Sequence, residues 1–312
     1  MNSKPSIIGS SSFSLSFSLG LLLVAGSAQA AALTKADTGS DLNDPASWTE
    51  AATPTDSDVA TWSGSALGAG LTLGIDTNWF GISVSGAASD IDISGSGALT
   101  LGVGGLDAAL ATVNITIGNP VVLGADQTWT IANGYGAIAN GVISGDAALT
   151  LAGRGSLTLH GANSYTGGTT LIGGSGTTLH LYNSSALGTG KLTMKNTSTT
   201  AAPALRLYEG ITITNAIEKD AATGRGAIGS YSGNVTLTGP MTLTAGNNAF
   251  YFTSSGETGT TLAISNSITG PEYTGAFSLR GTPGNLGIVH GQIALNSPCQ
   301  IIGDANWLIA SG

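Results

Sequence analysis

The fold of this chain is decided by residues 157–190, LTLHGANSYTGGTTLIGGSGTTLHLYNSSALGTG. Three short runs that alternate apolar and polar residues are separated here by Gly, Asn, Ser and Thr, a composition typical of short strands joined by tight corners. Leu157 and Leu179 are 22 positions apart, and so are Leu149 and Leu171. A repeat period in the twenties predicts a solenoid, because one coil cannot bury its own apolar face and depends on the coils on either side.

Triplets of the form apolar, polar, apolar recur throughout residues 87–312. Their period of two places the outer residues on one face of a strand and the middle residue on the other. Many triplets begin six to eight, 15 to 16 or 21 to 24 positions apart, close to one third, two thirds and one whole turn of a three-sided coil. A β-sandwich has turns about every 8–12 residues, a spacing that matches the triplet spacings of this chain only in part. We therefore expect an all-β parallel β-helix, with Leu157 stacked on Leu179 inside and Thr158 beside His180 outside.

The composition favours a thin, elongated solenoid over a mixed globular domain. The chain has 48 glycines, 9% charged residues and 6% aromatic residues, far from the usual balance of a globular protein. Such a sequence can fill a narrow interior with aliphatic side chains and cover it with Thr, Ser and Asn. The single cysteine, Cys299, cannot form an intramolecular disulfide, and we expect it to be a small buried residue.

The net charge of −9 is distributed unevenly along the chain. Residues 31–146 contain twelve acidic residues and one lysine, whereas residues 147–312 contain six acidic and seven basic residues. This distribution argues against nucleic acid as a partner, because phosphate neutralisation needs Lys and Arg. The acidic residues between positions 37 and 107 suit either solubility or weak binding of divalent cations, and the sequence leaves both open.

Residues 1–30 have the pattern of a signal peptide. Lys4 supplies the positive start, an uncharged Leu-rich stretch follows, and Ala28 and Ala30 form a small-x-small cleavage site. A retained membrane anchor is the alternative, but the Leu-rich part is short and its Ala-rich flank is typical of cleavage. We expect an exported chain that begins near Ala31.

Residues 31–86 differ from the repeats that follow. They contain three of the five tryptophans, Trp48, Trp62 and Trp79. A β-solenoid needs a cover over its open apolar end and its unpaired backbone groups, so we interpret this segment as an N-terminal cap. The alternative is that the three tryptophans form a surface on which sugars stack.

One set of residues resembles a known family motif. The residues that carry the resemblance are Leu157, Leu159, Gly161, Asn163, Tyr165, Thr166, Gly167, Gly168, Thr169, Leu187, Gly188 and Gly190. In this order and spacing they resemble the autotransporter-associated β-strand repeat, also called the passenger-associated transport repeat. One full copy, residues 157–190, covers about a tenth of the chain. His160 and the glycine-rich residues 173–176 depart from the family pattern.

The resemblance implies a right-handed parallel β-helix in a secreted or surface-displayed bacterial passenger, and it implies no catalytic residues. The expected function is a non-catalytic stem that assists secretion across the outer membrane and displays an adhesive region. The implied partners are the outer-membrane translocation machinery or a C-terminal β-barrel, with extracellular polysaccharide or a host or cell surface as targets. Because the chain stops at Gly312 directly after an apolar run, we expect it to be truncated there.

The alternative function is a carbohydrate-active β-helix protein, either a polysaccharide lyase or hydrolase or a sugar-binding module. An enzyme of this kind needs paired carboxylates across a groove, or a base beside an acid-held calcium. Asp90 and Asp92 alternate in a strand but lie in the half of the chain that has almost no cations. We therefore predict no catalytic residues and no cofactor.

Three further features are interpreted as ordinary surface. His160 and His180 lie about one coil apart, but no third metal ligand follows at a suitable spacing. The charge cluster around residues 216–222, which includes Glu218 and Lys219, predicts a solvated corner loop. The many threonines suggest an ice-binding or crystal-binding ladder, but the triplets jump between faces, so we favour ordinary β-propensity.

Overall fold

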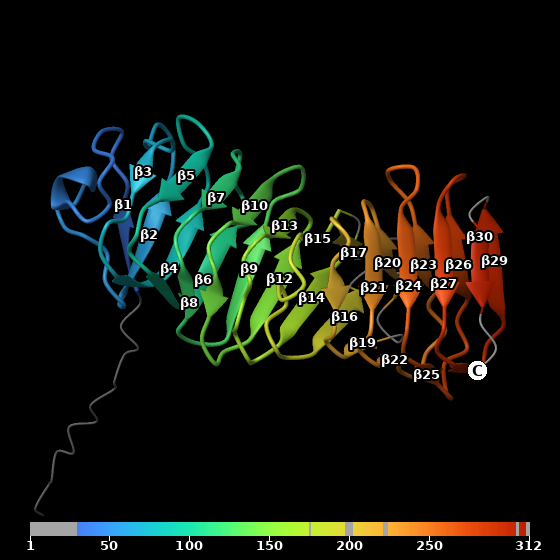
Figure 1. The fold of residues 1–312 in the computed structure, drawn as a ribbon. Helices are drawn as coiled ribbons and strands as arrows, with labels where there is room; N and C mark the ends of the chain where they lie inside the picture. The colour runs from blue at the N-terminus through green and yellow to red at the C-terminus, as the bar shows by residue number, and fades with distance from the viewer. Residues whose placement is uncertain (1–29, 175, 197–201, 221–223, 304–305, 310–312) are drawn as a thin grey trace, which may run out of the picture.

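The computed structural model describes residues 30–174, 176–196, 202–220, 224–303 and 306–309. They form one elongated stack of parallel coils, a β-solenoid of about 12 turns (Figure 1). The only helical element among these residues is the short 3-10 helix η1 (Pro45–Ser47). The all-β parallel architecture expected from the sequence is thereby confirmed. The segment predicted to be a signal peptide lies outside the described residues except for Ala30.

Each coil contributes a strand to up to three sheets. The first sheet runs through β1 (Ala31–Thr34), β2 (Asp58–Trp62), β4 (Thr77–Val84), β6 (Leu99–Ala108), β9 (Gln127–Ile131), β12 (Leu149–Gly153), β14 (Thr169–Gly173), β16 (Leu192–Asn196), β19 (Ile217–Lys219), β22 (Met241–Leu243), β25 (Ile268–Gly270) and β28 (Ile293–Leu295), and it also includes β8 (Val121–Leu123) and β11 (Ile143–Ser144).

The second sheet runs through β3 (Leu71–Thr72), β5 (Ile91–Ser94), β7 (Ile115–Ile117), β10 (Gly136–Ala139), β13 (Ser156–Leu159), β15 (Thr178–Leu181), β17 (Ala204–Leu207), β20 (Gly226–Ser230), β23 (Phe250–Ser254), β26 (Phe277–Gly281) and β29 (Cys299–Gly303). The third sheet occupies only the C-terminal coils, with β18 (Thr212–Ile213), β21 (Asn234–Leu237), β24 (Thr261–Ile264), β27 (Leu286–Val289) and β30 (Asn306–Ile309).

The predicted register is present in the second sheet. Leu157 pairs with Leu179 and Thr158 with His180, at a repeat of 22 residues. The coils lengthen toward the C-terminus, where Phe250 pairs with Phe277. Since neighbouring parallel strands lie about 4.8 Å apart, the same column of side chains continues from coil to coil despite this change in length.

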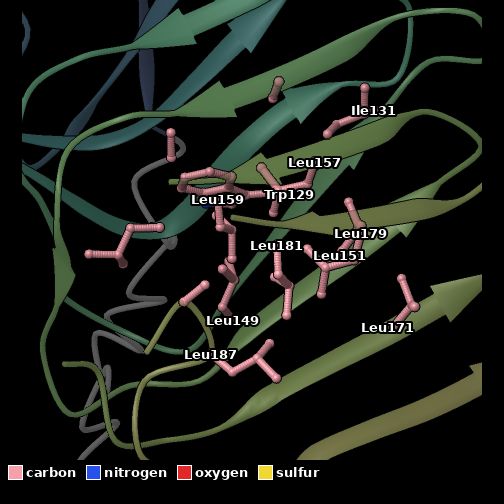
Figure 2. Packing of buried hydrophobic residues seen from close by; sticks show 14 of the residues in the cluster. Trp129, Ile131, Leu149, Leu151, Leu157, Leu159, Leu171, Leu179, Leu181 and Leu187 are labelled. Carbon is pink, nitrogen blue, oxygen red and sulfur yellow. The ribbon is translucent and has the colours of Figure 1, made fainter. Parts of the chain in front are cut away.

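The interior is a continuous column of buried aliphatic side chains. Leu157, Leu159, Leu179 and Leu181 of the second sheet point toward Leu149 and other residues of the first sheet, as Figure 2 shows. Alternation along each strand produces this arrangement, because every second residue turns inward. Complete burial of one such side chain stabilises the fold by about 1.5–3 kcal/mol.

The N-terminal coils are closed by tryptophan side chains. Trp48, Trp62 and Trp79 are all buried, and the ring of Trp48 packs edge-on against Trp62 at 5.7 Å and against Trp79 at 5.9 Å. The Trp-containing cap is present, and the sugar-stacking alternative is wrong because no ring face is available to a ligand. The parallel ladder already begins at β1, so residue 86 marks no break in the sheet.

Two expectations about single residues are wrong. Lys219 belongs to strand β19 and points inward, fully buried, because it alternates with Ile217; its Nζ donates to the carbonyl oxygen of Asp220. Cys299 is exposed. It pairs with Phe277 on an inward-facing column, but no further coil covers it among the described residues.

Candidate functional site

Asn163 of the family-like motif holds three coils together. Its side-chain oxygen accepts a hydrogen bond from the backbone N–H of Ile143 at 2.7 Å. Its side-chain nitrogen donates to the carbonyl oxygen of Ala186, also at 2.7 Å. The side chain is buried, so it satisfies backbone groups at a corner where the chain departs from regular strand pairing.

Tyr165 occupies the interior of the same corner. Its hydroxyl lies 2.5 Å from the Oγ1 atom of buried Thr169, and burial raises the pKa of Tyr165 to about 12. Gly188 packs directly on it with φ of +60°, and a Cβ atom there would approach the Tyr165 carbonyl oxygen to 2.1 Å. Only glycine fits both the backbone conformation and the space.

The remaining motif residues have similar structural positions. A Cβ atom at Gly161, Gly167, Gly168 or Gly190 would come within 2.8 Å of backbone in a neighbouring coil. Thr166 alone points outward, with its hydroxyl 3.4 Å from the carboxylate of Asp146. The motif side chains therefore pack coil against coil and leave no open reactive centre. Leu157, Leu159 and Leu187 are fully buried in the core.

One surface depression lies on the outer face of the second sheet. It is an open groove of about 650 Å³. Its floor includes one column of outward side chains in register, Ile138, Thr158, His180 and Arg206. Loops carrying Asn133, Tyr135 and Arg154 also line it. This surface, the "second-sheet groove", spans five coils from Asn114 to Arg206.

An aromatic stack runs along the edge of this groove. The rings of His160 and Tyr182 stack at 4.5 Å, those of Tyr182 and Tyr208 at 4.5 Å, and Tyr231 follows at 5.6 Å from Tyr208. The guanidinium of Arg206 lies 4.9 Å from the ring centre of Tyr231. These contacts fix the orientation of Arg206 at the end of the groove.

His180 contributes a neutral side chain to the groove. Its Nδ1 lies 3.0 Å from the hydroxyl of Tyr208. Burial, with a smaller effect of the Arg206 charge, lowers the pKa of His180 to about 4. The imidazole is therefore uncharged at neutral pH and available for hydrogen bonding, not for charge pairing.

The other candidate residues do not assemble into a reactive site. Asp90 accepts two hydrogen bonds from Asn114, at 2.9 and 3.0 Å, and these bonds lower the pKa of Asp90. His160 is exposed, whereas His180 lies on the groove floor. Within the described residues, no group of three or more His, Cys, Asp or Glu side chains is placed to hold a metal ion.

A row of threonines, which the sequence interpretation had not resolved, lies on the first sheet. Thr128, Thr150, Thr170 and Thr193 are in register on four successive strands, and Glu218 interrupts the row. The neighbouring outward column contains Thr130, Ala152, Ile172 and Lys195. The regular threonine row is thus one residue wide, and it is no flat two-dimensional array.

Sequence reasoning missed Arg206 and the tyrosines of the aromatic stack. A usable signal was present, because His160, Tyr182, Tyr208 and Tyr231 each directly follow a second-sheet strand. Residues at equivalent points of successive coils become neighbours in a solenoid.

Comparisons with protein-family models, with curated proteins and with solved structures find no match to this chain. The described part of the chain contains no helix long and apolar enough to cross a membrane.

Proposed function

We propose that this chain is a non-catalytic stem: an exported, rigid β-solenoid that assists its own secretion across the outer membrane and displays an adhesive surface outside the cell. The observation that supports it is the unbroken parallel ladder of the first sheet from β1 to β28. Each coil completes the hydrogen bonds and apolar contacts of the one before it. Such a stack can fold progressively from one end.

Progressive folding supplies a mechanism for export without a catalytic site. A coil that forms outside the membrane buries leucine side chains that the preceding coil left open, so its formation opposes backward movement of the chain. The translocation machinery, or a β-barrel segment beyond Gly312, would serve as the partner in that step. The proposed location is the cell surface, the outer membrane or the extracellular medium.

The test is a secretion assay in cells that carry the gene. Gly188→Val places a side chain against the Tyr165 carbonyl oxygen and blocks the stacking of adjacent coils. We expect the amount of protease-accessible protein at the surface and in the medium to fall severalfold, while synthesis of the chain is unchanged.

Thr166→Ala is the matched control, since Thr166 is an exposed residue of the same corner. Export of this control is expected at the wild-type level. Wild-type export of Gly188→Val, with that variant shown to be misfolded when purified, would contradict the coupling of folding to secretion.

A further inference from the structure

The second-sheet groove can hold a ligand only through side chains. Strand β10 pairs with β7 and β13, and β15 pairs with β13 and β17. The backbone groups under the groove are therefore already used on both sides of each strand. An extended peptide cannot add itself as a further strand here, which is how exposed sheet edges bind peptides.

The groove carries positive charge at one end and near its middle. Arg206 closes the column of Ile138, Thr158 and His180 at that end, and exposed Arg154 lies in the turn before β13, two coils away. None of the described residues that line the groove is acidic. This contrasts with the chain as a whole, which carries a net charge of −9, and planar guanidinium groups suit the two oxygens of a carboxylate.

The opposite end of the groove is polar and uncharged along its lining. Asn114 and Asn133 offer amide groups and Tyr135 offers an aromatic ring, and Thr158, midway along the groove, adds a hydroxyl group. Asp90 does not line the groove, and its carboxylate accepts two hydrogen bonds from Asn114. Amides, hydroxyls and an aromatic ring together suit a polyhydroxylated ring compound.

The length and shape of the groove fit a short oligomer. The column from Ile138 to Arg206 spans three inter-strand steps, or about 14 Å, and the volume of about 650 Å³ lies within the usual range of ligand sites.

We propose that the second-sheet groove binds an acidic oligosaccharide, with separate sugar carboxylates held at Arg206 and at Arg154, two coils away, and ring hydroxyls held by the amide and hydroxyl side chains toward Asn114. This inference goes beyond the stem function and does not depend on it. It assigns a ligand class to a face that the stem mechanism does not use.

The direct measurement is titration calorimetry of the folded chain with an oligogalacturonate of about six residues. A neutral hexose oligomer of the same length, a sulfated oligosaccharide and oligoglutamate serve as comparison ligands. We expect saturable binding of the oligogalacturonate that weakens as the salt concentration is raised. The three comparison ligands should bind about tenfold more weakly or worse.

Arg206→Gln is the principal variant, and Arg280→Gln is its matched control. Arg280 lies further along the same outward column, through Gly229 and Thr253. Like Arg206 it packs on a tyrosine ring, with 4.2 Å from its guanidinium carbon to the Tyr251 centre, and both have a buried Nε atom without a hydrogen-bond partner. The two substitutions therefore remove equivalent packing, but only Arg206 lines the groove.

We expect Arg206→Gln to weaken oligogalacturonate binding about tenfold or more, as loss of a charge-assisted hydrogen bond does, and Arg280→Gln to leave it unchanged. Arg154→Gln changes an exposed residue and should also weaken binding of the oligogalacturonate. This variant provides the test if Arg206→Gln unfolds.

The proposal is overturned if wild type does not bind oligogalacturonate at millimolar concentration, if both groove variants bind like wild type, or if Arg280→Gln weakens binding equally. Tighter binding of the sulfated ligand would overturn the carboxylate assignment, and tighter binding of oligoglutamate the saccharide assignment.

Discussion

The two ends of the described solenoid are built differently. At the N-terminal end, residues 35–48 fold back over the first coils, with an antiparallel bridge between Lys35 and Trp48, and Trp62 is fully buried beneath. At the C-terminal end, Ile301 and Leu308 are 55% and 56% exposed. A coil with the same inward pattern is therefore part of a core at one end and part of the surface at the other.

The difference shows that an inward position in a solenoid is not by itself a buried one. Ile301 continues the column of fully buried Leu279, yet more than half of its surface remains accessible. Burial requires a neighbour on both sides, and among the described residues a segment folds back to supply the second neighbour at the N-terminal end alone. The contrast predicts unequal energetic contributions from equivalent residues at the two ends.

The largest effect is expected from truncating a tryptophan at each end. Trp62→Ala removes a fully buried ring and should lower the free energy of unfolding by about 3–5 kcal/mol. Trp307 is only partly buried and packs on Gly287. Trp307→Ala should therefore lower the free energy of unfolding by only about 1–2 kcal/mol. Urea unfolding followed by far-ultraviolet circular dichroism measures both, and equal losses would refute the difference between the ends.

The second-largest effect is a pH dependence of the free energy of unfolding, and it arises from Lys219 in the interior coils between the two ends. Burial, partly offset by the Asp220 charge, lowers the pKa of Lys219 from 10.5 to about 8. Between about pH 8 and 10 the unfolded chain holds a proton that the folded chain has released, so the free energy of unfolding should rise with pH.

The expected gain is on the order of 2 kcal/mol over this range, measured by urea unfolding at several pH values. Lys219→Met is the control and should flatten the rise. Above pH 10 the trend should reverse, because burial raises the pKa of Tyr165 and of Tyr273 to about 12 and only the unfolded chain then loses those protons. A Lys219→Met slope equal to that of the wild type would contradict the assignment.

A smaller effect is expected from the family-like corner. Tyr165→Phe removes the hydroxyl that contacts Thr169 and leaves the ring in place, so the free energy of unfolding should fall by about 1 kcal/mol. Thr166→Ala, on the outer side of the same corner, should change it by less than about 0.5 kcal/mol. If the two variants had the same free energy of unfolding, the hydrogen bond between Tyr165 and Thr169 would contribute nothing to stability.

The smallest effect on stability is expected at the exposed C-terminal coil. Leu308→Lys should change the free energy of unfolding by less than about 0.5 kcal/mol. It should also reduce binding of a hydrophobic dye and concentration-dependent association, because it interrupts the C-terminal patch of exposed apolar side chains, Ile301, Ile302, Leu308 and Ile309. Ile75→Lys replaces a side chain that is 65% exposed away from this end. It is the control, and an equal reduction in that variant would show that the C-terminal patch has no special role.

Much of the fold was predictable from the sequence. The 22-residue repeat and the triplets predicted parallel coils, inward leucines and the register of Leu157 with Leu179, because each depends on periods of two and of one coil. Lys219 was misassigned because its charge was given more weight than its alternation with Ile217. Cys299 was misassigned because an unpaired cysteine usually behaves as a small buried residue, whereas no further coil covers Cys299 among the described residues.

The candidate site was much less predictable. Arg206 reaches the groove beside His180 and Thr158 because three successive coils are in register, although their lengths differ. Leu157 and Leu179 are 22 residues apart, whereas Leu179 and Leu205 are 26 apart. A fixed period read from the sequence cannot place residues that are separated by coils of unequal length.

The sequence by itself therefore determined the class of fold, since local alternation and tight glycine corners allow few structures other than stacked strands. Only the tertiary structure decided which outward residues share a surface, which inward residues are buried, and that the two basic residues Arg154 and Arg206 line one groove. The physical reason is that burial and surface chemistry in a solenoid are properties of neighbouring coils, whereas the sequence pattern of one coil describes that coil alone.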